Sequence, residues 1–179
     1  MRSLGSWFRR SGLNTGLWIY AERVLDLNQL DVDEIATALS DQTDYEHRWL
    51  IDPRTGQVAF WTVDTGIDGQ NPVDLDELDL IPIDPVPSYI WYQDMADFAE
   101  GISDDTAGRR LARAIRGKGA FRRFRDELHA EYPDLVSVWQ AFRDTRAKRR
   151  AVEWLLDQGL IDQAAGQHYL SDHPDPDLP

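Results

Sequence analysis

The sequence predicts an α+β fold, in which a small antiparallel sheet with a short N-terminal helix packs on a C-terminal bundle of three or four helices. Strand-like runs occupy residues 45–63, and Pro85 and Pro87 separate them from a segment in which apolar residues recur every three or four positions. Hydrophobic residues make up 42% of the 179 residues and include seven Trp, which is enough for a packed core.

The length favours a single domain with flanking segments. We expect residues 1–16, which are rich in Gly, Ser and Arg, to form a weakly ordered arm. Residues 17–161 form the predicted domain, with an acidic β-containing half over 17–84 and a helical half over 88–161. The Pro-containing segment 162–179 is predicted to be a partly disordered tail.

The first elements of the domain are a strand and a helix. Leu17 to Leu27 mixes β-branched and aromatic residues, as strands do. Asp31 with Glu34 three positions later forms an Asp variant of the capping box, and an apolar stripe follows. These residues predict a short helix over 32–41.

A β-hairpin is the strongest local prediction of the chain. Strand-like runs at 45–52 and 57–63 are separated by residues 53–56, in which Pro presets φ and Gly permits a positive φ. Residues 80–83 predict a further short strand at a sheet edge, because Pro82 lacks the N–H that a central strand needs.

Helical periodicity dominates from Ser88 onward. The predicted helices cover residues 89–101, a segment capped by Asp104 or Asp105, a segment from about Ala120 that Pro133 ends, and residues 134–158 before Gly159. In the third helix, the spacing of Phe121, Phe124, Leu128 and Tyr132 predicts that all four are core residues.

Charge is distributed unevenly along this acidic chain, whose formal net charge is -13. Residues 31–108 carry nineteen acidic and two basic side chains, whereas residues 109–151 carry thirteen basic and five acidic ones. The densest part is Arg116–Arg125, RGKGAFRRFR, called the basic run below. Such a segment attracts either the protein's own acids or an anionic partner.

The basic run is the main candidate for an anion-binding site. Gly117 and Gly119 allow close backbone approach, the next helix begins with free N–H groups, and positive charge comes from Arg116, Lys118, Arg122 and Arg123. Such a site fits a phosphate or a nucleic-acid backbone. The alternative is that the glycines only form a tight helix joint while the arginines pair with the acidic half.

A second basic cluster lies on the last long helix. Arg143, Arg146 and Arg150 share a face by their spacing and extend the electrostatic surface if the two basic helices pack side by side, for which we expect an antiparallel arrangement. Alone, the cluster is typical of a solvated helix face.

The residues RGKGAFRRFRDEL and WQAFRDTRAKRRAVEWL, followed by Gly159 and Leu160, resemble the signature region of Uncharacterised Protein Family 0158, a bacterial family without an assigned function. The resemblance covers residues 25–161, and its most specific parts are the GKGAFRRF core and the pattern formed by Trp139, Phe142 and Arg143. It implies membership of the family and brings no catalytic residue.

No pattern in the sequence indicates catalysis, a metal or a cofactor. The chain has no Cys, and its four His (His47, His129, His168 and His173) lack metal-ligand spacing. We therefore expect a non-enzymatic, cytoplasmic binding or regulatory protein that contacts nucleic acid or another phosphate-bearing ligand and no membrane. The alternative is a protein–protein adaptor that binds a basic partner through its acidic half; the sequence leaves the oligomeric state open.

Overall fold

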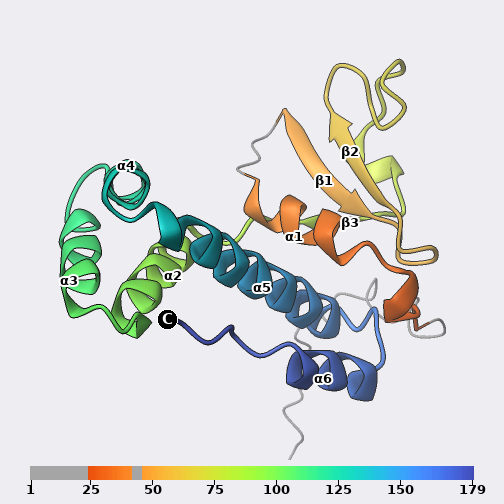
Figure 1. Cartoon of the computed structure of the whole chain (residues 1–179). Helices are drawn as coiled ribbons and strands as arrows, with labels where there is room; N and C mark the ends of the chain where they lie inside the picture. Colours follow the sequence, from red (N-terminus) through yellow and green to blue (C-terminus); the bar gives the residue numbers. More distant parts are fainter. Residues whose placement is uncertain (1–23, 42–45) are drawn as a thin grey trace, which may run out of the picture.

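A computed structural model describes residues 24–41 and 46–179 (Figure 1). The predicted arm over 1–16 and most of the predicted strand over 17–27 lie outside these residues. Within the described part, Leu25 forms an isolated parallel bridge with Ile161. A 3-10 turn, η1 (Leu27–Gln29), follows it.

The N-cap half of the capping box predicted at Asp31 is present in the structure. The Asp31 carboxylate accepts a hydrogen bond from the Glu34 N–H at 2.9 Å and so begins α1 (Val32–Ser40). The apolar stripe of this helix, formed by Ile35, Ala38 and Leu39, is buried. A cap and an amphipathic pattern together explain why this segment is helical.

The sheet has three antiparallel strands in the order β2-β1-β3, as predicted in class and hairpin position. The strands are β1 (His47–Ile51), β2 (Val58–Thr62) and β3 (Ile81–Ile83). Pro82 lies opposite Leu50 in the edge strand β3, where a missing N–H is tolerated. The short 3-10 turn η2 (Leu75–Glu77) lies in the acidic connection between β2 and β3.

The helical half contains the four predicted helices and one more. They are α2 (Ser88–Gly101), α3 (Asp105–Ala114), α4 (Ala120–Glu131), α5 (Pro133–Asp157) and α6 (Gln163–Asp172). Asp104 caps α3 through bonds to two backbone N–H groups. Pro133 begins α5, where its fixed φ and missing N–H are compatible with a first helical position.

Two hydrophobic cores lie along α5. Figure 1 shows α2, α3 and α4 gathered around one end of this helix. The sheet core combines α1 and strand residues such as Ile51 with Ala151 and Leu155 of α5. The helical core combines α2, α3 and α4 with Phe142 of α5. The 25-residue helix therefore positions the basic segments of α3 and α4 relative to the acidic sheet end.

The segment 162–179 differs from the predicted disordered tail. Asp162 caps α6 by accepting a hydrogen bond from the Ala165 N–H at 3.0 Å. Beyond α6, the Pro179 carbonyl accepts a hydrogen bond from the Ser103 N–H at 2.6 Å, and Leu178 packs on the helical core. These contacts were not predictable from the Pro-rich composition, because they depend on surfaces supplied by α2 and α5.

Candidate anion-binding site and an adjoining pocket

The loop between α3 and α4 has the backbone conformation that the two glycines of the basic run predict. Gly117 and Gly119 have φ values of 79° and 75°, in the left-handed region that glycine adopts most readily. Gly119 is also the N-cap residue of α4, and no side chain caps that end. The first N–H groups of α4 therefore have no side-chain acceptor, which leaves the positive end of the helix dipole available to an anion.

Arg123 holds this loop from within. Its Nε donates to the Ala114 carbonyl at 2.9 Å, and its two terminal nitrogens donate to the carbonyls of Arg116, Gly117 and Lys118. Carbonyls at the end of α3 and in the loop have no hydrogen-bond donor within a helix, and the Arg123 side chain supplies one. Arg123 was predicted as an anion ligand, but its guanidinium donors are directed to the backbone.

The other cations of the basic run face solvent. Arg116, Lys118 and Arg122 are exposed, as is Arg113 on the preceding helix. Among residues 24–41 and 46–179, no acid forms an ion pair with any of these four side chains. Arg110, by contrast, pairs with Glu127 and Glu131 at 2.7 and 3.0 Å. Neutralisation by the protein's own acids therefore applies to only part of the basic segment.

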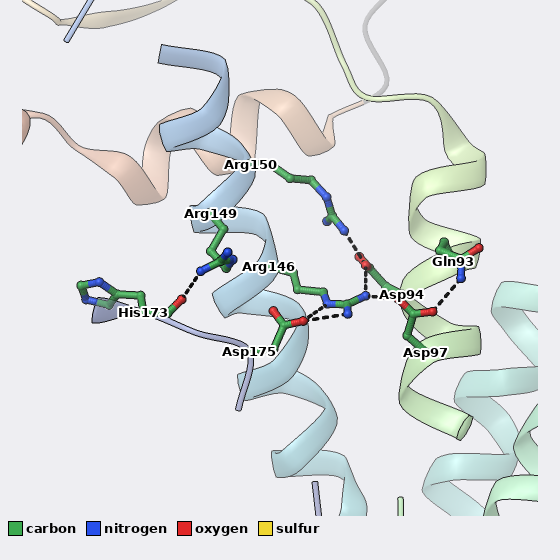
Figure 2. Close-up of polar contacts among 8 residues, drawn as sticks. All are labelled: Gln93, Asp94, Asp97, Arg146, Arg149, Arg150, His173 and Asp175. Carbon is green, nitrogen blue, oxygen red and sulfur yellow. Dashed lines mark hydrogen bonds and ion pairs between the residues drawn. The ribbon is translucent and has the colours of Figure 1, made fainter. Parts of the chain in front are cut away.

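The second basic cluster is largely turned inward, as Figure 2 shows. Asp94 of α2 is 1% exposed and accepts a hydrogen bond from Arg146 at 3.1 Å through its Oδ1, which also accepts from Arg150. Arg146 further pairs with Asp97 of α2 and with Asp175 after α6, the latter at 2.7 Å. Arg146 and Arg150 were predicted as anion ligands, yet carboxylates of the chain already bind them.

Arg146 and Asp97 shift each other's pKa. Burial favours the neutral form of Asp97, but hydrogen bonds from Arg146 and Gln93 outweigh it and lower the pKa of Asp97. Burial likewise opposes the charge of Arg146, and its bonds to Asp175, Asp97 and Asp94 raise the pKa of Arg146 overall. Asp97 and Arg146 are therefore both charged at neutral pH.

Arg143, the third predicted ligand of this cluster, remains exposed and lies 3.1 Å from its neighbour Asp144. The predicted antiparallel packing of the two basic helices is wrong: Figure 1 views α4 down its axis and α5 from the side. Because the helices cross and Arg146 and Arg150 face α2, the two basic clusters do not form the single broad surface that the spacing suggests.

A pocket of about 840 Å³ adjoins the basic run. Residues of α1, α2, α4 and α5 line it, including the aromatic side chains of Trp91, Phe121, Phe124 and Trp139. The buried residues Asp94 and Met95 also belong to the lining. Charged side chains of both signs also line it: Arg125, Arg143, Lys148, Asp33 and Asp144. Arg143 pairs with Asp144, and Lys148 pairs with Asp33.

Phe121 corrects a sequence prediction. Spacing assigns it to the core with Phe124, and Phe124 is indeed 2% exposed, whereas Phe121 is 50% exposed. The two residues are three positions apart, so their side chains point in related but different directions, and only Phe124 reaches Phe98 and Trp139. Phe121 lines the open pocket instead.

Asp94 and Asp97 are functional-site candidates that sequence reasoning missed. Asp94 interrupts the apolar stripe of α2 between Trp91 and Phe98, and an acid in such a stripe indicates a buried, paired carboxylate. Its partners on α5 are 52 and 56 residues away, so spacing within either helix does not identify the pair.

The histidines are separated in the structure. His129 is exposed on α4, His168 lies 3.1 Å from Asp172, and the His173 ring stacks on Tyr169 at 4.0 Å. In the part of the chain that the structure describes, no three His, Asp or Glu side chains are grouped as metal ligands. No helix in that part combines the length and the apolar composition needed to cross a membrane.

Comparison with known proteins extends the resemblance found in the sequence. The family model described as "Uncharacterised protein family (UPF0158)" matches residues 23–174, which includes α6 as well as the basic run. A relative from Pseudomonas aeruginosa, UPF0158 protein PA5073, is 29% identical over 151 residues, covering 84% of this chain and 95% of that protein. No solved structure matches the chain. On the extent of the family match, this chain belongs to the UPF0158 family.

Proposed function

We propose that this chain is a non-enzymatic binding protein that contacts the phosphates of a nucleic acid through the basic run. The observation that carries the proposal is the exposure of Arg116, Lys118 and Arg122, which have no ion pair with any described acid in a chain of net charge -13. Cations left unpaired despite so many available carboxylates are free to bind phosphate oxygens.

The backbone of the same loop supports the proposal. Gly119 begins α4 without a side-chain cap, so N–H groups and the helix dipole add to the field of Lys118 and Arg122. Arg123 contributes by fixing the loop rather than by touching the ligand. A site held in one conformation before binding loses less entropy when the ligand arrives.

The proposal includes a cytoplasmic location, where a bacterial protein meets both RNA and DNA. Catalysis forms no part of it, because the cations are suited to neutralising a backbone and no paired acid and base accompany them in the loop. The sequence-independent nature of phosphate contacts also fits a site built from flexible side chains.

Binding of fluorescent single-stranded RNA and DNA, measured by anisotropy at several salt concentrations, tests the proposal. We expect the logarithm of the association constant to fall linearly with the logarithm of salt concentration. Arg122→Glu should reduce the slope by about 0.7 for each phosphate that the variant no longer neutralises. Arg48→Glu makes the same change in net charge on β1 and should bind like the wild type; no salt-dependent binding by the wild type would sink the proposal.

An adaptor role is the second candidate, and the acidic connection between β2 and β3 favours it. Asp64, Asp74, Asp76, Glu77 and Asp79 have no ion pair with any described cation, so this surface can attract a basic protein. Capture of partners from nuclease-treated lysate by the wild type, and by a variant with Asp76 and Glu77 changed to Lys, separates the two roles. The adaptor role would be favoured by a protein partner that the wild type captures and the Lys variant does not.

A further inference from the structure

Helices α3 and α4 are joined by a short turn that contains glycine. Three residues, Arg116 to Lys118, separate the C-cap of α3 at Ile115 from the N-cap of α4 at Gly119. Figure 1 views α4 end-on and α3 from the side, so the two helices cross at a steep angle. Apolar residues of α2, α3 and α4 share one core, which fixes this angle: Phe98, Leu111, Phe124 and Leu128. This is the arrangement of a helix-turn-helix, in which the second helix is the one that contacts DNA.

The second helix of this unit presents one continuous polar face. Arg122, Arg125 and His129 follow one another at spacings of three and four, and all three are exposed, as is Asp126 beside them. The opposite side of the helix is buried in the helical core, at Ala120, Phe124 and Leu128. Helix α4 is thus held by its apolar side and offers four polar side chains, called the α4 face below, to a partner.

The α4 face stands between two hollows. Phe121 and Arg125 line the pocket of about 840 Å³ on one side, and Asp126 and Ala130 line a hollow of about 550 Å³ on the other. The face is therefore a ridge, which fits into a groove of its partner. Proteins that bind single strands instead hold them in a groove of their own, lined with several aromatic side chains.

The size of a helix selects the kind of duplex that the ridge fits. With its side chains an α-helix is about 10–12 Å across, and the major groove of B-DNA is about 12 Å wide. The major groove of an RNA duplex is deep and narrow, so side chains do not read its bases. The ridge is therefore suited to a DNA duplex and not to an RNA duplex.

Free cations lie beside the first turn of α4. Arg113 near the end of α3, together with Arg116 and Lys118 in the turn, is exposed and forms no ion pair with any acid of the described ranges. The acids next to the ridge are paired within the chain: Glu127 and Glu131 with Arg110, Asp144 with Arg143, and Asp33 with Lys148. The unpaired charge at the turn is therefore positive and complementary to phosphates.

We propose that α4 enters the major groove of duplex DNA, with Arg125 binding the edge of a guanine while Arg116, Lys118 and Arg122 bind phosphates. The inference rests on the proposed function, since the cations of the basic run must neutralise those phosphates. It names the B-form duplex as the nucleic acid and adds base contacts to a site that otherwise binds only the backbone.

The choice of guanine follows from the donors of the α4 face. An arginine donates two parallel hydrogen bonds to guanine O6 and N7, which are both acceptors in the major groove. The Arg125 side chain is 68% exposed, and its ion pair with Asp126 is long at 3.8 Å. The Asp126 carboxylate is an acceptor for the N4 amino group of the paired cytosine. These two neighbouring side chains are therefore suited to one G·C pair.

The first experiment compares three nucleic acids of one sequence and length, namely duplex DNA, duplex RNA and single-stranded DNA, in binding to the full chain at fixed salt. We expect duplex DNA to bind at least about fivefold more tightly than duplex RNA, the lower end of the range for one base contact. Attraction to phosphates alone predicts no preference for DNA, because both duplexes carry two phosphate strands.

Modified guanines locate the contact in one groove. Replacing guanine by 7-deazaguanine removes the N7 acceptor from the major groove and should weaken binding of duplex DNA by about fivefold or more. Replacing guanine by hypoxanthine removes only the N2 amino group from the minor groove. This second duplex is the matched control and should bind with unchanged affinity.

The variant Arg125→Ala connects the base contact to one side chain. Because Arg125 is exposed, its removal leaves the fold intact. The variant should bind the guanine and 7-deazaguanine duplexes equally, since the donor to N7 is gone. Arg48→Ala removes an exposed arginine from β1 and is the control, which should discriminate between the two duplexes as the wild type does.

Equal affinity for duplex DNA and duplex RNA, tighter binding of the single strand, or no effect of 7-deazaguanine would overturn the groove inference. Salt-dependent binding that still requires Arg122 would then leave the proposed function standing. Absence of binding to all three nucleic acids removes the proposed function itself, so the two failures are distinguishable.

Discussion

Arg146 of α5 donates a hydrogen bond to Asp94 of α2 across 3.1 Å and at the same time binds Asp97 and Asp175. One guanidinium thus connects three segments that are far apart in the chain. The Phe142 ring lies 4.4 Å from the Arg146 guanidinium, so the cation is also packed against the helical core.

Arg146→Ala should destabilise the protein by about 3 kcal/mol, because it leaves Asp94 with one cation in a buried site. Urea unfolding followed by far-UV circular dichroism measures the change. Arg143→Ala, on the same helix but in an exposed pair with Asp144, should cost less than about 1 kcal/mol. Equal destabilisation by the two variants would contradict a structural role for the network.

Stability should fall in acid through Asp97. Its pKa is lower in the folded state than its ordinary value, so the folded protein holds its proton less tightly than the unfolded chain does. The resulting stabilisation is complete above the unfolded pKa of about 4 and disappears as pH falls through the lower folded pKa. Urea midpoints from pH 7 to pH 3 should decline less steeply in Asp97→Asn than in the wild type, and parallel profiles would contradict the assignment.

Arg122 and Arg123 should have opposite roles although they are adjacent. Arg123→Ala removes bonds to three loop carbonyls and to the last carbonyl of α3, and should cost about 2 kcal/mol, whereas Arg122→Ala should leave the unfolding free energy within about 0.5 kcal/mol. Denaturant unfolding of both variants, run beside the anisotropy assay, provides the test. A decrease in the stability of Arg122→Ala that matches its decrease in nucleic-acid affinity would mean that the binding defect is indirect.

Asp175 should hold the segment after α6 against α5. Asp175→Ala removes two hydrogen bonds to Arg146 and should cost about 1 kcal/mol, since the pair is partly exposed and screened. The Ser103 N–H, which donates to Pro179, should then exchange faster with solvent. Asp177→Ala, which removes an exposed acid two residues away, is the control. An unchanged exchange rate of the Ser103 N–H in both variants would show that Asp175 does not hold this segment.

Local chemistry explains which elements were predictable. Asp31 caps α1 through a residue three positions away, and the Gly56 turn lies between its two strands, so the information is contained in a few neighbouring residues. The family resemblance was confirmed, and the match reaches 174 rather than 161. That extension corresponds to α6, which helical spacing in the tail did not reveal.

The candidate site was less predictable because its parts meet only after folding. The positions of the glycines in the loop were predicted correctly. Whether Arg122 or Arg123 faces solvent depends on the rotation of α4 about its axis, which residue spacing does not determine. Arg146 and Arg150 have the spacing of a solvated face and become internal only because Asp94 approaches from α2. Long-range carboxylate partners cannot be inferred from the spacing of residues within one helix.

The sharing of α5 by two cores has a consequence for how the protein unfolds. Phe142 belongs to the helical core and Ala151 to the sheet core, nine positions along an uninterrupted helix. Melting either core exposes one side of this helix and weakens the packing that remains on the other. We therefore expect heat or denaturant to produce a single cooperative transition, with the slowest amide exchange in the middle of α5.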